Sequence, residues 1–175
     1  MRFYKLLSEY AAEIGVAEKL GSGADGIVWA FHSNKAIKFC IGNFNNIQGV
    51  LNLIEHKSDY YVKVYDYCKV SKYLEYDVYY YVMERLIPLS EDENKVFHTL
   101  ISHEDCKKVK KYSIDDVCGI LDEMSNFLLF DKEKVLFLIK KIYSDEIQHL
   151  DLSERNVMKD NRGNFKLIDL ERIKI

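Results

Sequence analysis

The change in apolar periodicity at Pro88, the only proline, is the feature that most restricts the fold of this chain. Before it, apolar and polar residues alternate over several segments, and glycines separate those segments. After it, residues 91–148 contain no proline and one glycine, and apolar residues recur every three or four positions. Alternation indicates strands, and the longer period indicates helices. The sequence therefore predicts an α+β protein with a β-rich N-terminal lobe, residues 1–86, and a helical C-terminal lobe, residues 87–175.

The N-terminal lobe is predicted to be a mostly antiparallel sheet with two helices. Apolar residues at helical spacing place the helices at residues 3–14 and 44–56. Segments rich in β-forming residues predict the strands. These lie at about 16–21, 26–32, 35–40, 60–70 and 76–86, with turns at 33–34 and 71–75.

The C-terminal lobe is predicted to contain three helices and a small hairpin. The helices lie at about 92–103, 114–129 and 132–147. The hairpin is formed by "NVMKD" and "NFKLIDL", with a turn at "NRG". A chain with two lobes is expected to hold its ligand between them.

Charge and composition exclude several function classes. The formal net charge of -3 gives no overall field for nucleic acid, and we interpret the local run Lys107–Lys111 as a solvated helix face. No run of 18 apolar residues predicts a membrane span, and the N-terminus does not resemble a secretion signal. The four cysteines have wide, irregular spacings without a CxxC pair, which indicates free thiols in a reducing compartment such as the cytoplasm.

Glycines and a lysine provide the first candidate ligand-binding residues. The segment "GSGADG" places Gly21, Gly23 and Gly26 before the strand-like "IVWAF". Most such patterns are ordinary glycine turns, but a strand–turn–strand of this kind also lets the backbone lie close to phosphates. In "KAIKF", Lys38 alternates with apolar neighbours and is expected to project to the opposite side of the sheet from them, as a solvated residue or a ligand-binding one.

The C-terminal region adds three polar residues at a characteristic spacing. "HLDLSERN" contains His149, Asp151 and Asn156, and "LIDLE" contains Asp169. Together with the glycine loop and "AIK", in this order, the sequence resembles the protein-kinase-like family, whose signature is a Gly-rich loop, a VAIK lysine, an HRDxxxxN loop and a DFG aspartate. The resemblance covers residues 15–171 and implies a bilobal protein kinase-like fold with a reduced helical C-lobe.

The resemblance implies a role for each matched residue. Lys38 would pair with the α- and β-phosphates of ATP, and Asp151 would be the catalytic aspartate that accepts a hydrogen bond from the incoming hydroxyl. Asn156 and Asp169 would bind Mg²⁺ through oxygen atoms. His149 would orient the loop rather than react.

The same resemblance predicts an adenine site on the N-terminal lobe. Val28 and Ala36 would line this site, and Met83 would lie at its rear. The backbones of Glu84 and Leu86, in "YYVMERL", would hydrogen-bond the adenine edge.

Several residues depart from the kinase pattern. Leu150 follows His149 where many regulated kinases have arginine, and the sequence ends six residues after Asp169, which predicts a lobe without an activation segment. Ser153 stands where serine/threonine kinases usually have lysine, and Arg155 could supply that charge as in tyrosine kinases. The acid that should pair with Lys38 is either Glu55 or replaced by Gln48, or the pair is missing.

These features favour a minimal ATP- and Mg²⁺-dependent protein kinase that phosphorylates Ser, Thr or Tyr. Its size resembles small kinases of bacterial effectors and bacteriophages, which implies a protein substrate and, for some of them, an activating host partner, in the cytoplasm or in a host cytosol. Neither a nucleic acid nor a membrane is expected as a partner. Two alternatives remain: a pseudokinase that binds nucleotide or acts as a scaffold, and a small-molecule kinase of the aminoglycoside type.

Overall fold

The computed structural model divides the α+β chain into two compact units, Met1–Ser58 with Val62–Arg85, and Asp59–Tyr61 with Leu86–Ile175. It describes residues 2–24, 26–42, 44–55, 58–101, 112–143 and 152–169. Among the described helices, none combines the length and the apolar character needed to cross a lipid bilayer.

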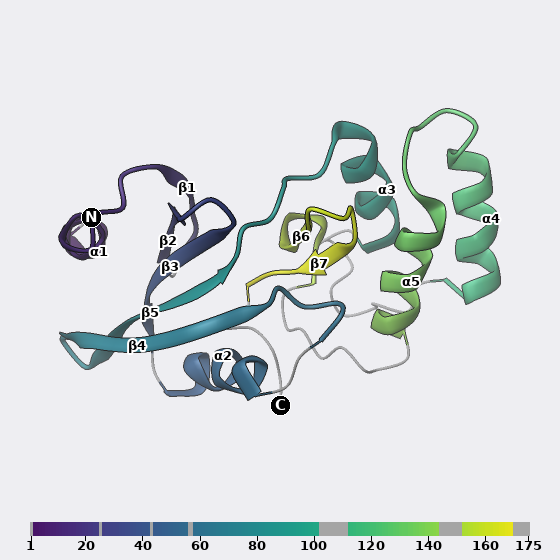
Figure 1. Cartoon of the computed structure of the whole chain (residues 1–175). Helices are drawn as coiled ribbons and strands as arrows, with labels where there is room; N and C mark the ends of the chain where they lie inside the picture. Colours follow the sequence, from purple (N-terminus) through teal and green to yellow (C-terminus); the bar gives the residue numbers. More distant parts are fainter. Residues whose placement is uncertain are drawn as a thin grey trace. The chain divides into compact units, whose positions relative to one another are not determined.

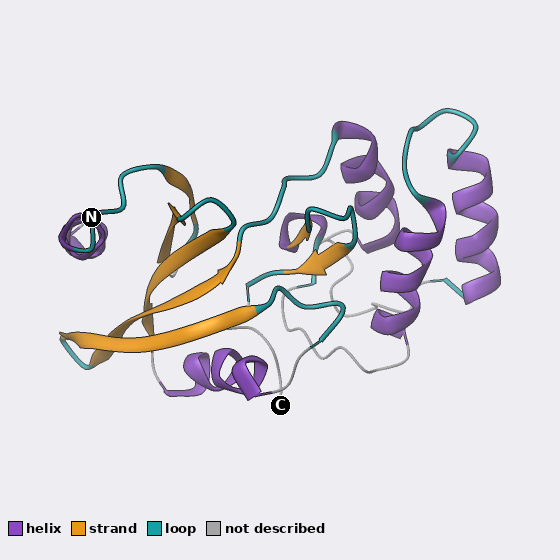
Figure 2. Cartoon of the chain, viewed as in Figure 1, coloured by secondary structure: helices purple, strands orange, loops and turns teal. Residues whose placement is uncertain are grey.

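The first unit is built on a five-stranded sheet (Figures 1 and 2). Its order is β1-β2-β3-β5-β4, and every neighbouring pair is antiparallel. The strands are β1 (Lys19–Ser22), β2 (Gly26–Phe31), β3 (Lys35–Gly42), β4 (Val64–Tyr73) and β5 (Tyr76–Glu84), and the helices are α1 (Arg2–Glu13) and α2 (Phe44–Glu55).

One face of this sheet packs against α1. Leu7 and Ala11 of the helix are buried against apolar residues of the sheet. The sheet residues are Ile27, Trp29, Ile37, Phe39, Val78 and Val82. Burial of each large apolar side chain contributes about 1.5–3 kcal/mol, so this cluster fixes α1 on the sheet. Helix α2 packs against β3 and β4.

The second unit combines three helices with a short hairpin. The elements are α3 (Glu91–Ile101), α4 (Ile114–Met124), α5 (Lys132–Tyr143), a 3-10 helix η2 (Glu154–Asn156), β6 (Val157–Lys159) and β7 (Phe165–Leu167). The buried rings of Phe97 in α3 and Phe165 in β7 pack edge to face, with 4.9 Å between their centroids. This contact joins α3 to the hairpin.

The predicted elements are confirmed in type over the described residues, and three of them have wrong bounds. The predicted ends of the helices at 92–103 and 132–147 lie outside the described residues. The strand expected at 16–21 begins only at Lys19, because Gly15, at φ +76°, ends α1 and the Val16 amide bonds back to the Ala11 carbonyl. The helix expected at 114–129 ends at Met124, and the Leu129 amide instead donates to the Asp92 carboxylate at 3.0 Å.

The third error concerns the strand predicted at 60–70, which begins at Val64 and continues to Tyr73. Tyr61 instead forms a parallel bridge to Leu167, and the Leu167 amide donates to the Tyr60 carbonyl at 2.8 Å. The segment "YYVKV" therefore contributes to both units. The turn expected over residues 71–75 is confined to Leu74 and Glu75, where Leu74 has φ +56°.

Candidate functional site

Four of the predicted nucleotide-binding residues share one face of the five-stranded sheet. Val28 is paired with Lys38, and Ala36 with Met83, in the antiparallel registers of β2, β3 and β5. Residues directly opposite each other in such a ladder lie on the same face, as do residues two apart along one strand. Val28, Ala36, Lys38 and Met83 therefore form one patch, on the face opposite to the α1 cluster.

Lys38 is the only charged residue of this patch. Its neighbours Ile37 and Phe39 are buried in the α1 cluster, whereas Lys38 is half-buried on the other face. Its Nζ lies 5.9 Å from the ring centroid of Tyr81, the residue directly across the ladder on β5. An ammonium near an aromatic face is attracted to the ring quadrupole, so Tyr81 stabilises the charge of Lys38 on the patch.

The structure explains the presence of glycine at only one of the three glycine positions of the loop. A Cβ at Gly26 would lie 2.2 Å from the Phe39 carbonyl oxygen, so the close approach of β2 and β3 requires glycine there. A Cβ at Gly21 or Gly23 would meet no described residue within 4 Å. Packing thus explains Gly26 but leaves Gly21 and Gly23 unexplained, as expected if these two serve a ligand.

Gly26→Ala is expected to lower the free energy of unfolding by about 1–3 kcal/mol, because β2 and β3 must separate to admit the methyl group. Gly23→Ala, where the methyl group meets none of the described residues, is expected to change it by less than about 1 kcal/mol. Urea unfolding of both variants checks this contrast. Equal stability of the two variants would contradict it.

The predicted adenine-binding backbone is partly occupied by the protein itself. The Glu84 amide donates to the Lys63 carbonyl at 2.9 Å, and the Glu84 carboxylate accepts from the Lys63 amide at 2.8 Å. Glu84 could therefore offer an adenine only its carbonyl oxygen. Leu86 follows two residues later, and its main chain forms no hydrogen bond to the described part of the protein.

Helix α2 carries both candidates for the partner of Lys38. The side-chain amide of Gln48 donates to the Asn52 side chain of the same helix at 3.3 Å. Glu55 is the last residue of α2 and is exposed. Gln48 is therefore already engaged within its helix.

The two candidate metal ligands of the second unit lie at the same end of the β6–β7 hairpin. Val157 pairs with Leu167, and one step further the Ile168 amide donates to the Asn156 carbonyl at 2.9 Å. Asp169 follows directly, half-buried and at φ +62°. A residue with a side chain at positive φ costs about 1 kcal/mol or more, and such strain concentrates at functional sites.

The remaining predicted residues are placed as follows. His149 and Asp151 lie outside the described residues, immediately before the buried Leu152 and Ser153. Arg155 lies on η2 with its side chain 80% exposed, and its Nε is 3.8 Å from the Glu154 carboxylate. Within the described ranges, no group of three His, Cys, Asp or Glu side chains is placed to hold a metal.

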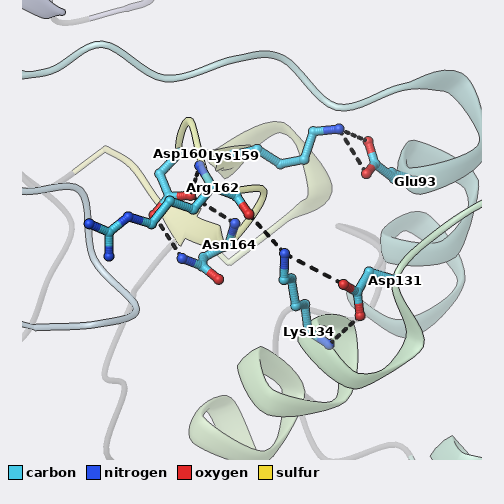
Figure 3. A network of polar contacts seen from close by, with 7 residues as sticks. All are labelled: Glu93, Asp131, Lys134, Lys159, Asp160, Arg162 and Asn164. Atoms are coloured by element: carbon cyan, nitrogen blue, oxygen red, sulfur yellow. Dashed lines mark hydrogen bonds and ion pairs between the residues drawn. The ribbon is translucent and has the colours of Figure 1, made fainter.

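Two structural carboxylates near the hairpin were not predicted from the sequence. Glu93 of α3 is 7% exposed and forms an ion pair with Lys159 of β6 at 2.7 Å (Figure 3). Glu93 also closes a capping box with Ser90, whose pattern Ser-x-x-Glu is visible in "SEDE". Asp160 holds the hairpin turn by accepting from the amides of Arg162 and Asn164.

Both carboxylates have a lowered pKa. Burial alone raises the pKa of each, but for Glu93 the hydrogen bonds from Lys159 and Ser90 outweigh burial. For Asp160 the bonds from Asn164 and Arg162 do the same. These groups therefore stabilise the second unit in their charged form.

Glu93→Gln is expected to lower the free energy of unfolding at pH 7 by about 1–3 kcal/mol, because Lys159 loses a buried ionic partner. Glutamine still suits the capping position, so the change isolates the ion pair. Since the folded pKa of Glu93 is depressed, its contribution is present above the ordinary pKa of about 4.5 and is lost as pH falls through the folded pKa. Unfolding at pH 7 and at pH 3 checks this: the difference between the two proteins should shrink in acid.

Comparison of the sequence with models of known protein families gives no match, and comparison with curated proteins gives no significant match.

Proposed function

We propose that the protein is a phosphotransferase of the protein-kinase-like class that transfers the γ-phosphoryl group of ATP to a hydroxyl group of a protein, with Mg²⁺ as cofactor. The observation that carries this proposal is the patch of Val28, Ala36, Lys38 and Met83 on one sheet face. Three apolar side chains around a single half-buried ammonium suit a flat base joined to a charged phosphate tail. The bilobal kinase-like fold is part of the proposal.

The residues of the β6–β7 hairpin suit the proposed cofactor. Asn156 and Asp169 would hold Mg²⁺ through an amide and a carboxylate oxygen, the hard donors that this ion prefers. Bound there, the ion would neutralise charge on the phosphate oxygens. The backbone strain at Asp169 supports a functional reason for its conformation.

Each of the remaining proposed residues would then have a separate role in the reaction. Lys38 would hold the α- and β-phosphates, and Asp151 would take the proton of the acceptor hydroxyl. The acceptor oxygen forms the new bond to the γ-phosphorus while the bond to the β–γ bridging oxygen breaks, and ADP leaves. Such a transfer depends on alignment and charge neutralisation more than on covalent help from the protein.

Calorimetric titration of the protein with ATP, with and without Mg²⁺, tests the nucleotide site, and labelled ATP with a protein lysate tests transfer. We expect Mg²⁺-dependent binding and labelled protein. Binding without transfer under any partner condition would favour a pseudokinase, and transfer to a soluble alcohol would favour a small-molecule kinase. Absence of Mg²⁺-dependent binding would contradict the proposal.

A further inference from the structure

Helix α1 is joined to the glycine loop by one side-chain hydrogen bond. The Tyr4 hydroxyl donates to the Gly23 carbonyl at 2.7 Å, across 19 residues of sequence. The Gly23 amide in turn donates to the Gly26 carbonyl at 2.9 Å, which closes the loop. Both polar groups of Gly23 are therefore occupied, and the plane of the following peptide is fixed.

The position of α1 determines the direction in which this carbonyl points. Tyr4 packs at the margin of the cluster that α1 forms with Ile37 and Phe39. Its hydroxyl therefore reaches the loop from the face of the sheet that α1 covers. The Gly23 carbonyl is therefore directed toward the Tyr4 hydroxyl, on the side of α1.

The geometry of the peptide group determines where the next amide points. The peptide that joins Gly23 to Ala24 is trans and planar, so its N–H points opposite to its C=O. With the carbonyl held toward Tyr4, the Ala24 amide is directed away from α1, whose cluster lies on the sheet face opposite to Lys38. That amide forms no hydrogen bond to the parts of the chain that the structure describes.

We infer that Tyr4 is a positioning residue, which turns the Ala24 amide toward the phosphates of a bound nucleotide. The inference rests on the proposed function, because it assigns that nucleotide to the Lys38 face. Backbone N–H groups in glycine turns are effective donors to phosphate oxygens. The open space at Gly23 leaves room for a phosphate to approach the backbone.

The test compares Tyr4→Phe with Tyr10→Phe. Tyr10 lies on the same helix, and its hydroxyl donates to the Ser71 hydroxyl at 2.8 Å, so its variant loses a similar bond far from the loop. Dissociation constants of Mg²⁺-ATP and of adenosine are measured for both variants and the unchanged protein. Loss of one aligned donor is expected to weaken ATP binding about 3- to 10-fold in Tyr4→Phe. Adenosine, which lacks phosphates, should bind all three proteins equally, and Tyr10→Phe should bind ATP as the unchanged protein does.

Amide hydrogen exchange gives a second readout that needs no nucleotide. Exchange of the Gly23 amide should be about 3- to 10-fold faster in Tyr4→Phe and unchanged in Tyr10→Phe. The role of Tyr4 would be overturned if Tyr4→Phe bound ATP as tightly as the unchanged protein, or if its affinities for ATP and adenosine fell equally. Either result would leave the proposed function untouched. An unchanged protein that binds no Mg²⁺-ATP would overturn the proposed function and the ligand assigned to this amide with it. Unaltered Gly23 exchange in Tyr4→Phe would show that the hydroxyl does not hold the loop.

Discussion

Replacing Asp169 by asparagine is expected to reduce Mg²⁺-dependent phosphoryl transfer by roughly 100-fold. Of the two proposed ligands on the β6–β7 hairpin, Asp169 would supply the only charge, because Asn156 is neutral. Loss of a charged metal ligand weakens stabilisation of the transferring group by on the order of 3 kcal/mol, which corresponds to this factor. Initial rates with labelled ATP over a range of Mg²⁺ concentrations check the prediction.

The backbone of Asp169 makes this experiment easy to control. Asparagine tolerates φ +62°, and glycine adopts it freely, so Asp169→Asn and Asp169→Gly should both fold. Their free energy of unfolding should stay within about 1 kcal/mol of the unchanged protein. Asp115→Asn, on the exposed first turn of α4, should retain full activity. Full Mg²⁺-dependent transfer by Asp169→Asn would remove this residue from the metal site.

Replacing Lys38 by methionine is expected to lower kcat/KM for ATP about 10- to 100-fold. Methionine keeps most of the length and the apolar contacts of the side chain but removes the ammonium that would hold the phosphates. A hydrogen bond to a charged group contributes about 1.5–3 kcal/mol, which sets the size of the effect. Steady-state rates at several ATP concentrations provide the measurement.

Lys35→Met is the matched control for this change. Lys35 lies three residues earlier on β3, on the opposite face of the strand, where its Nζ lies 4.8 Å from the centre of the Tyr65 ring. This variant should keep the activity of the unchanged protein. The double variant Lys38→Met with Asp169→Asn should lose less than the product of the two single effects if both residues act on one nucleotide. Equal activities of Lys38→Met and Lys35→Met would exclude Lys38 from the reaction.

Strand periodicity predicts only part of the face that Val28, Ala36, Lys38 and Met83 share. Alternation along β3 fixes Lys38 on the side opposite to Ile37 and Phe39, whatever the neighbouring strands do. Val28 and Met83 join Lys38 and Ala36 only because the registers align them with β3. The sequence predicted both strands but contains no local signal for their registers.

Contacts between distant segments explain why the strand predicted at 60–70 begins later, and they include an ion pair that the sequence does not indicate. Tyr60 and Tyr61 have high β propensity and were assigned to one strand with the residues that follow, yet they pair with Leu167, more than a hundred residues away. The ion pair of Glu93 with Lys159 joins residues 66 apart, so no window of sequence indicates it.

The sequence by itself thus determined the type of almost every element, because strand alternation, helical period and glycine turns depend only on residues that are close in sequence. The carboxylate, amide and ammonium of the proposed site can likewise be read directly from the sequence. Tertiary structure alone decided that Gly26 serves the approach of β2 to β3 and that Tyr4 holds Gly23. Each of these depends on the distance between atoms far apart in the chain, which packing of the whole unit sets and no short segment specifies.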